Sequence, residues 1–126
     1  KVWSLEDGIE EFTLTGSGDG IVCAAVSADG KRVISGCSAQ DVLVRVWDLE
    51  RHCEDYSLTG HTQQVSSAAI TPDGKKAVTG SDDKQIKLWD LDRKQLEFTF
   101  NGHAENVSAI VFTPDLKRIV SGSEDN

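Results

Sequence analysis

The sequence predicts an all-β protein built from repeated units of four antiparallel strands. The first observation is a motif that recurs with a period of 42–44 residues, as the spacing of Trp3, Trp47 and Trp89 shows. The second is that a complete copy divides into four short strand-like runs separated by turn residues. A period of this length is typical of repeat architectures, in which neighbouring units bury one continuous core.

The motif is most complete in residues 59–91. It opens with Gly-His, continues through a Pro-Asp-Gly turn and a Thr-Gly pair followed by acidic residues, and closes with Trp-Asp. Altered or shortened copies occupy residues 15–49 and 101–125, and the missing end of the last copy matches residues 1–5. We therefore expect a single domain, 1–126, made of the end of one repeat (1–14), two repeats (15–58 and 59–100) and the start of another (101–126).

Four strands are expected in the middle repeat, at residues 65–70, 76–80, 85–89 and 96–100. In the last of these, Leu96, Phe98 and Phe100 alternate with polar residues, as in a strand with one buried face. The turn between the first two strands is Pro72-Asp73-Gly74, in which proline presets φ and glycine tolerates the left-handed region. The residues after each expected strand therefore favour a chain reversal.

Composition and charge argue against two classes of function. A formal net charge of −8 and a pI near 4.7 disfavour broad binding to a phosphate backbone, which requires a basic surface. No run approaches the roughly 18–20 apolar residues of a membrane-spanning helix. We expect neither a nucleic-acid partner nor membrane insertion.

The cysteines and acidic residues predict no cofactor and no metal. Cys23, Cys37 and Cys53 are odd in number and lack Cys-X-X-Cys spacing, which favours a reducing, cytoplasmic compartment. The pair His52-Cys53 has no second ligand pair for a zinc site, and Asp82-Asp83 is too sparse for a calcium loop.

A Gly-His opening, four short strands and a Trp-Asp closure together resemble the WD-repeat β-propeller family, along essentially the whole chain. The resemblance implies radial blades of four antiparallel strands, with three blade-equivalents in this chain. It also implies an offset register, in which the last strand of one repeat forms the outer edge of the next blade.

Propellers typically have about 4–8 blades, so three blades do not close a ring. We expect closure by homo-oligomerisation: a dimer gives six blades, inside that range, whereas a trimer gives nine. Two alternatives stay open, because Gln85 and Ile86 have no counterpart at the chain ends. The chain is then an excerpt of a longer array, or a short connecting piece is missing.

The resemblance further implies a buried hydrogen-bonded tetrad of Asp, His, Ser or Thr, and Trp in each blade. Its members would be His61, Thr79, Asp83 and Trp89; His103, Ser121 and Asp125 with Trp3; and Ser35, Asp41 and Trp47, with Ser17 at the histidine position. His, hydroxyl and Asp also serve nucleophilic catalysis, but this set is repeated and lacks a Gly-X-Ser-X-Gly elbow. We interpret these residues as structural and expect no enzyme.

We expect a non-catalytic scaffold for protein–protein interaction, because rigid blades present their loops to partners. By resemblance, the partner-binding face would carry Gln40, Gln64, Ser66, Asp82, Asn106, Ser108 and Glu124, with Val22 near Gln40. The acidic members favour a basic or arginine-containing peptide. Basic pairs such as Lys31-Arg32 would form a solvated rim on the other face. The alternatives are a fragment of a larger sensor or assembly regulator whose catalytic domain lies elsewhere, and a hydrolase that uses His, Ser and Asp.

Overall fold

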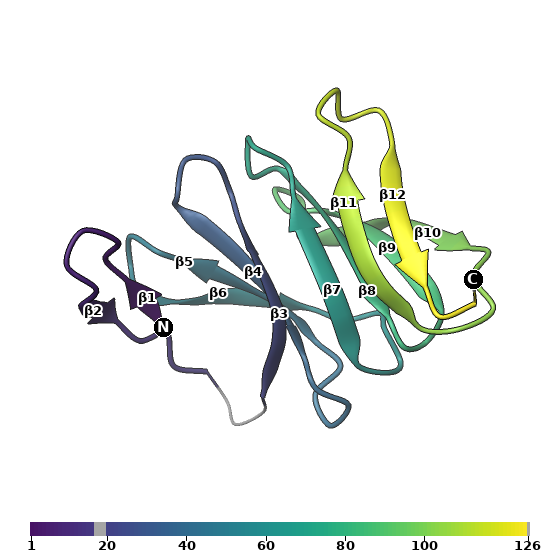
Figure 1. Ribbon diagram of the computed structural model, residues 1–126, viewed down its shortest axis with the longest axis horizontal. Coiled ribbons are helices and arrows are strands. Elements are labelled where there is room, and N and C mark those ends of the chain that lie inside the picture. Colours follow the sequence, from purple (N-terminus) through teal and green to yellow (C-terminus); the bar gives the residue numbers. More distant parts are fainter. Residues whose placement is uncertain (17–19, 126) are drawn as a thin grey trace.

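The computed structural model describes residues 1–16 and 20–125, which form twelve β-strands in four antiparallel sheets (Figure 1). Within these residues no helix is present that could cross a membrane. The all-β prediction is confirmed. The strands are β1 (Val2–Trp3), β2 (Glu10–Phe12), β3 (Ile21–Val26), β4 (Arg32–Cys37), β5 (Val44–Asp48), β6 (Cys53–Leu58), β7 (Val65–Ile70), β8 (Lys76–Ser81), β9 (Gln85–Asp90), β10 (Gln95–Asn101), β11 (Val107–Phe112) and β12 (Ile119–Ser123).

Two sheets are complete blades of four strands, in the orders β3-β4-β5-β6 and β7-β8-β9-β10. The other two sheets, β1-β2 and β11-β12, contain two strands each. The sheets stand face to face as a fan, with β3, β7 and β11 side by side and with β1-β2 and β12 at opposite ends (Figure 1). The four-stranded antiparallel unit expected from the sequence is therefore present.

The hydrophobic core lies between the sheets. The core between the two complete sheets consists of Ile34, Val44, Val46, Leu58, Val65, Ala77, Trp89 and Leu91. The core between the second complete sheet and β11-β12 consists of Val78, Ile86, Val107 and Ile110. Successive residues of a strand point to opposite faces, so Ala77 and Val78 of β8 enter different cores. The sheet β7-β8-β9-β10 thus depends on both of its neighbours.

Two glycines let neighbouring sheets approach closely. A Cβ atom on Gly36 would lie 2.6 Å from Val65, and one on Gly80 would lie 2.6 Å from Val107 Cγ1. In both junctions, the first residue of an inner strand packs over a glycine in the second strand of the preceding sheet. A Cβ atom on the equivalent Gly122 in β12 would have Ala109 Cβ, at 3.7 Å, as its nearest neighbour among the described residues.

The first hairpin of each blade is closed by one type of turn. In the second complete sheet the Thr71 hydroxyl donates to Asp73 Oδ1 at 2.6 Å, and the Lys75 backbone N–H donates to the same oxygen at 3.0 Å. Gly74 then takes a left-handed φ of 67°. In the third hairpin Leu116 takes this place with φ 57°, a conformation that costs a non-glycine residue roughly 1–2 kcal/mol.

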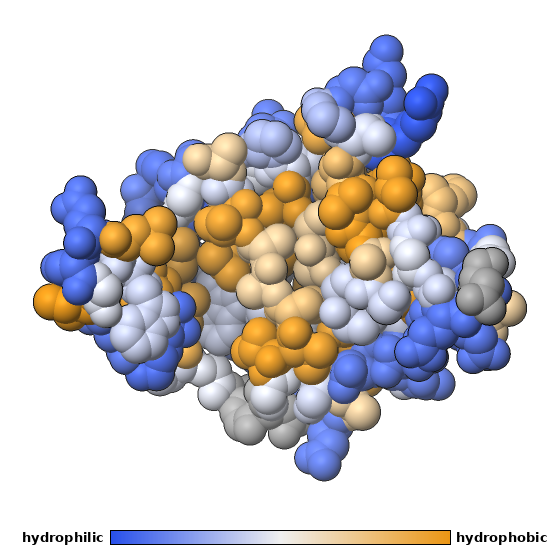
Figure 2. Space-filling view, viewed as in Figure 1, coloured by the Kyte–Doolittle hydropathy of each residue, from blue (hydrophilic) through white to orange (hydrophobic). Residues whose placement is uncertain are grey.

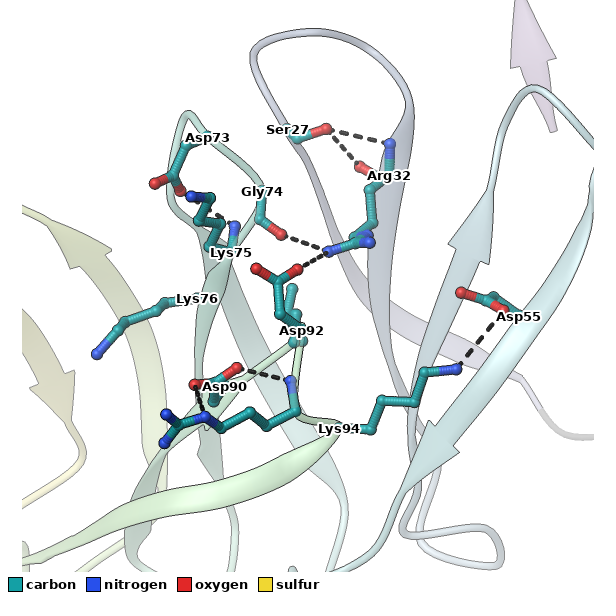
Figure 3. Close-up of polar contacts among 12 residues, drawn as sticks. Ser27, Arg32, Asp55, Asp73, Gly74, Lys75, Lys76, Asp90, Asp92 and Lys94 are labelled. Atoms are coloured by element: carbon teal, nitrogen blue, oxygen red, sulfur yellow. Dashed lines mark hydrogen bonds and ion pairs between the residues drawn. The ribbon is translucent and has the colours of Figure 1, made fainter.

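Polar side chains bridge the two complete sheets along one edge of their junction (Figure 3). Arg32 donates to the Gly74 carbonyl at 2.7 Å, and its guanidinium lies 3.6 Å from Asp92 Oδ1. Lys94 Nζ lies 3.9 Å from Asp55 Oδ1 across the same junction. Arg32 therefore joins two sheets, whereas the sequence predicted a solvated position for it.

We expect Gly80→Ala to lower the free energy of unfolding by about 1–3 kcal/mol, because the added methyl group must displace Val107. Urea denaturation followed by tryptophan fluorescence measures this change. Gly20→Ala is the matched control, because a Cβ there meets no described residue within 4 Å and the other repeats carry Gln64 and Asn106 at that position. Equal losses in the two variants would contradict the close-contact role of Gly80.

Candidate functional site

A chain of hydrogen bonds joins four side chains in the second complete sheet. Trp89 of β9 donates its indole N–H to Thr79 Oγ1 of β8 at 2.8 Å. His61, in the loop before β7, lies 2.8 Å from Thr79 Oγ1 through Nε2 and 2.8 Å from Asp83 Oδ2 through Nδ1. Asp83 belongs to the turn between β8 and β9. One network therefore ties a loop, two strands and a turn together.

The donor pattern is satisfied by a neutral imidazole. Because Thr79 Oγ1 accepts from Trp89, the threonine hydrogen is available for His61 Nε2, and His61 Nδ1–H then donates to Asp83. Burial lowers the pKa of His61, and the Asp83 carboxylate opposes that shift without overcoming it. The positive charge of Lys87 adds to the lowering.

The Asp83 carboxylate also anchors backbone groups. It accepts hydrogen bonds from the backbone N–H of Thr62 at 3.0 Å and of Gln85 at 3.0 Å. Burial alone would raise the pKa of Asp83, but these hydrogen bonds and the one from His61 outweigh burial and lower it. The carboxylate therefore stays ionised while it holds the loop against the turn.

The last repeat contains three members of the same network. His103 lies 2.8 Å from Ser121 Oγ through Nε2 and 3.0 Å from Asp125 Oδ2 through Nδ1. Asp125 also accepts the Ala104 backbone N–H at 2.6 Å, and this bond is the main cause of its lowered pKa. No tryptophan among the described residues donates to Ser121. Trp3 lies in β1, at the opposite end of the fan from β12 (Figure 1).

The first repeat differs at the histidine position, where Ser17 lies outside the described residues. Trp47 donates its indole N–H to Ser35 Oγ at 2.8 Å, as expected of a tetrad. Asp41 instead pairs with the guanidinium of Arg45, which also donates to Glu54 Oε2 at 2.6 Å. Arg45, which aligns with Lys87, was not predicted as a site residue. The available signal was a long cationic side chain within the repeat that lacks the histidine.

Thr79, His61 and Asp83 are arranged like a nucleophile, a base and an orienting acid, but their surroundings are unsuited to catalysis. Thr79 is fully buried and His61 is only 4% exposed, so a substrate carbonyl does not reach the hydroxyl. The Trp89 indole already donates to that oxygen. What the arrangement does chemically is satisfy buried polar groups and stiffen the blade.

Residues predicted for the binding face lie together at one end of two successive hairpins. The Asp82 backbone N–H donates to Gln64 O at 3.0 Å, and the Glu124 N–H donates to Asn106 O at 3.1 Å. Asp82 and Glu124 each precede a tetrad carboxylate, Asp83 or Asp125. The tetrad therefore fixes the backbone from which each acidic side chain extends.

The two serines predicted for this face have different surroundings. The Ser66 hydroxyl donates to Gly80 O at 3.2 Å and to Val107 O, so it links one sheet to the next. Ser108 is exposed and donates to Gly122 O at 3.4 Å. Gln40 is exposed in the turn before Asp41, and Val22 is 43% exposed in β3.

Lys84 partly neutralises the acidic residues Asp82, Glu105 and Glu124 at this end of the hairpins. Lys84 Nζ donates to Ala104 O at 2.6 Å and lies 3.5 Å from Glu105 Oε1, joining the turn of one blade to the loop of the next. Within the described part of the chain, no group of three or more His, Cys, Asp or Glu side chains is arranged to hold a metal ion.

Comparison with known families gives one match. A family model described as "WD domain, G-beta repeat" matches three segments of the chain, residues 8–48, 53–90 and 94–126. A search of curated proteins found no match. The three matched segments correspond to the recurring motif, whose Trp-Asp ends fall at Asp48 and Asp90.

We expect Trp89→Ala to lower the free energy of unfolding by about 3–5 kcal/mol, because the largest buried side chain is lost. Asp83→Ala leaves His61 Nδ1 without its hydrogen-bond partner and should cost about 1–3 kcal/mol. The neighbouring Asp82→Ala is the control and should stay within about 0.5 kcal/mol of the parent. Urea denaturation compares the three. Similar curves for the two aspartate variants would show that Asp83 is no anchor.

We expect the free energy of unfolding to decrease as the pH falls below about 6.5, the ordinary histidine value. The pKa of His61 is lower in the folded state than in the unfolded state, so the unfolded chain binds more protons in this interval. The contribution of His61 to the free energy of unfolding is complete above about pH 6.5 and is lost as the pH falls through the pKa of His61 in the folded state. Carboxylates with lowered pKa values, such as that of Asp83, change the free energy of unfolding at lower pH.

Urea titrations between about pH 7.5 and 5.5 measure this slope, with His61→Gln as the variant that does not titrate. The variant should be less stable but flatter in its response to pH. A rise in stability on acidification, or an equal slope in the variant, would contradict the assignment.

Proposed function

Because the chain belongs to the WD-repeat family, we propose that it is a non-catalytic scaffold that presents one rim of its blades to a protein or peptide partner. WD repeats are generally protein-interaction scaffolds and generally do not catalyse reactions. The proposed contact residues are those predicted for the binding face: Gln40, Gln64, Ser66, Asp82, Asn106, Ser108 and Glu124.

One observation carries this proposal. In two successive repeats, a tetrad carboxylate holds the turn while the preceding carboxylate, Asp82 or Glu124, extends from the same backbone. Backbone hydrogen bonds from Asp82 N–H to Gln64 O and from Glu124 N–H to Asn106 O hold a residue with an amide side chain next to each acidic residue. A rigid, repeated set of acceptors suits recognition of an extended chain.

The charge of this rim favours a basic partner. Asp82, Glu105 and Glu124 outnumber Lys84, and the whole chain carries a formal net charge of −8. An arginine or lysine side chain would bind these carboxylates, whereas a phosphate backbone would be repelled. The described cysteines are free thiols, which supports a reducing, cytoplasmic location.

The scaffold that we propose is a closed homo-oligomer. The chain supplies two complete four-stranded sheets and two half-sheets, which together equal three blades. Two copies give six blades, within the usual range of about 4–8, and three copies give nine. We favour the dimer on this ground.

We expect charge reversal by Asp82→Lys with Glu124→Lys to weaken binding of a fluorescent arginine-rich peptide roughly tenfold at low salt, because exposed ion pairs contribute about 0.2–1 kcal/mol each and reversal adds repulsion. Fluorescence anisotropy measures the affinity, and an acidic peptide of equal length tests charge selectivity.

The control pair is Glu50→Lys with Glu97→Lys, which changes the net charge equally at exposed positions away from the proposed face. It should bind the basic peptide more tightly than the Asp82 and Glu124 double variant does. If both double variants lose the same affinity, the peptide responds to net charge alone and the proposed face is wrong.

A further inference from the structure

The dipeptide Asn101-Gly102 stands where β10 ends and the loop that carries His103 begins. Both of its residues are exposed, and Figure 2 shows a largely hydrophilic surface over this part of the fan, at the right of the view. The other two repeats carry Thr15 and Thr59 at the position of Asn101, each followed by glycine. The last repeat therefore places a side-chain amide where the others place a hydroxyl group.

The exposure of this position does not depend on how many sheets lie beside it. At the junction between the two complete sheets, Thr59 and Gly60 are also exposed. They remain exposed although the ring of Trp89 lies 3.0 Å from the position of a Cβ on Gly60. Residues at this point of a repeat are thus in contact with solvent even where a complete sheet packs against the next.

An asparagine that precedes a glycine can react with its own backbone. The backbone nitrogen of the glycine attacks the side-chain carbonyl carbon, a C–N bond forms, and the side-chain nitrogen leaves as ammonia. The product is a cyclic imide, a succinimide. Glycine favours this reaction because it has no Cβ to hinder ring closure and because its backbone reaches conformations that other residues avoid.

The backbone nitrogen of Gly102 is free to make this attack. Its N–H has no hydrogen-bond partner among the described residues. In the Asp-Gly pairs of the described chain, by contrast, the glycine N–H donates to a backbone carbonyl oxygen: Gly8 to Ser4, Gly30 to Ser27 and Gly74 to Thr71. Those turns hold the nitrogen in place, whereas Gly102 lies outside both the turn and the strand pairing.

The side chain of Asn101 supplies the carbonyl carbon. Gln85 Nε2 donates to Asn101 Oδ1 at 3.2 Å. This oxygen gains negative charge as the carbon is attacked, and a hydrogen-bond donor stabilises such charge. The second described asparagine, Asn106, is less suited to the reaction, because the residue after it is Val107, which is fully buried in β11.

We propose that Asn101-Gly102 is a site of spontaneous covalent modification. Gly102 N displaces ammonia from the Asn101 side chain, and water then opens the succinimide at either carbonyl group. One opening gives aspartate at position 101, and the other gives isoaspartate, in which the main chain continues through the former side chain. Water is the only co-reactant, and either product adds one negative charge.

The isoaspartate product changes the loop that follows. It adds one atom to the main chain two residues before His103, whose Nδ1 lies 3.0 Å from Asp125 Oδ2. The Ala104 N–H donates to the same carboxylate at 2.6 Å. The longer main chain displaces both partners, so the turn that carries Glu124 loses part of its anchor. Only the meaning of this loss for Glu124, a proposed contact residue, rests on the function proposed above.

The test is ageing of the full chain in mildly alkaline buffer, followed by proteolysis after glutamate and mass spectrometry. Cleavage after Glu97 and Glu105 separates Asn101 from Asn106. The fragment 98–105 should gain the mass that accompanies replacement of an amide NH₂ by OH. A protein-isoaspartate methyltransferase should then label this fragment. The fragment that begins at Asn106 should show neither change.

Two variants test the reacting groups. Asn101→Thr introduces the residue of the other repeats, removes the amide and should abolish the gain in mass. Gly102→Ala should slow the gain at least about tenfold, because a Cβ restricts the backbone and hinders ring closure. A Cβ at this position meets no described residue within 4 Å, so the fold should be kept.

Three outcomes would overturn the proposed site. They are a parent chain whose fragment 98–105 gains no mass, a gain at Asn106 as fast as the gain at Asn101, and a Gly102→Ala variant that reacts at the parent rate.

Hydrogen exchange of the Ala104 N–H measures the consequence for the loop. In the aged parent it should exchange at least about tenfold faster than in the fresh parent, because its hydrogen bond to Asp125 is weakened. Aged Asn101→Thr should exchange like its fresh form. Unchanged exchange in a chain that carries isoaspartate would show that the loop does not respond.

The fluorescent arginine-rich peptide separates this inference from the proposed function. Faster exchange at Ala104 with an unchanged affinity for the peptide would confirm the modification and its effect on the loop. The same result would contradict the role of Glu124 in the proposed binding face.

Discussion

Face-to-face burial between neighbouring sheets is the constraint on which the rest of the structure depends. The apolar residues of β8 alternate between two cores, so they are all buried only when another sheet packs against each face of the sheet that contains β8. The close contacts at Gly36 and Gly80 set the spacing of the sheets.

The polar network within a blade connects the packed core to the loop and the turn at one edge of the blade. Trp89 belongs to the core between the sheets, yet its indole N–H begins the chain of hydrogen bonds that ends at Asp83. Asp82 immediately precedes Asp83 in the sequence. Only a few hydrogen bonds thus connect the buried Trp89 with the turn that carries the charged Asp82 side chain. A non-catalytic repeat can support recognition in this way.

The repeat motif predicted the four-stranded units, because the Trp-Asp spacing and the turn residues are local signals. It also named the residues that meet around His61. It did not predict the role of Arg45, because the pairing with Asp41 and Glu54 depends on a side-chain path between strands. Nor did it predict that Arg32 reaches Gly74, since a basic pair after a turn is usually solvated. A pattern within one repeat does not predict which residues contact each other between repeats.

The open fan has a consequence for local motion. The sheet β7-β8-β9-β10 is the one complete sheet in the described part of the chain with another sheet against each face. In arrays stabilised by nearest neighbours, opening begins at the ends and spreads inward. In a chain that is not associated, amide hydrogens of β8 should therefore exchange with solvent more slowly than those of β1 or β12. The chain then has a gradient of rigidity, with its best-ordered rim at Asp82.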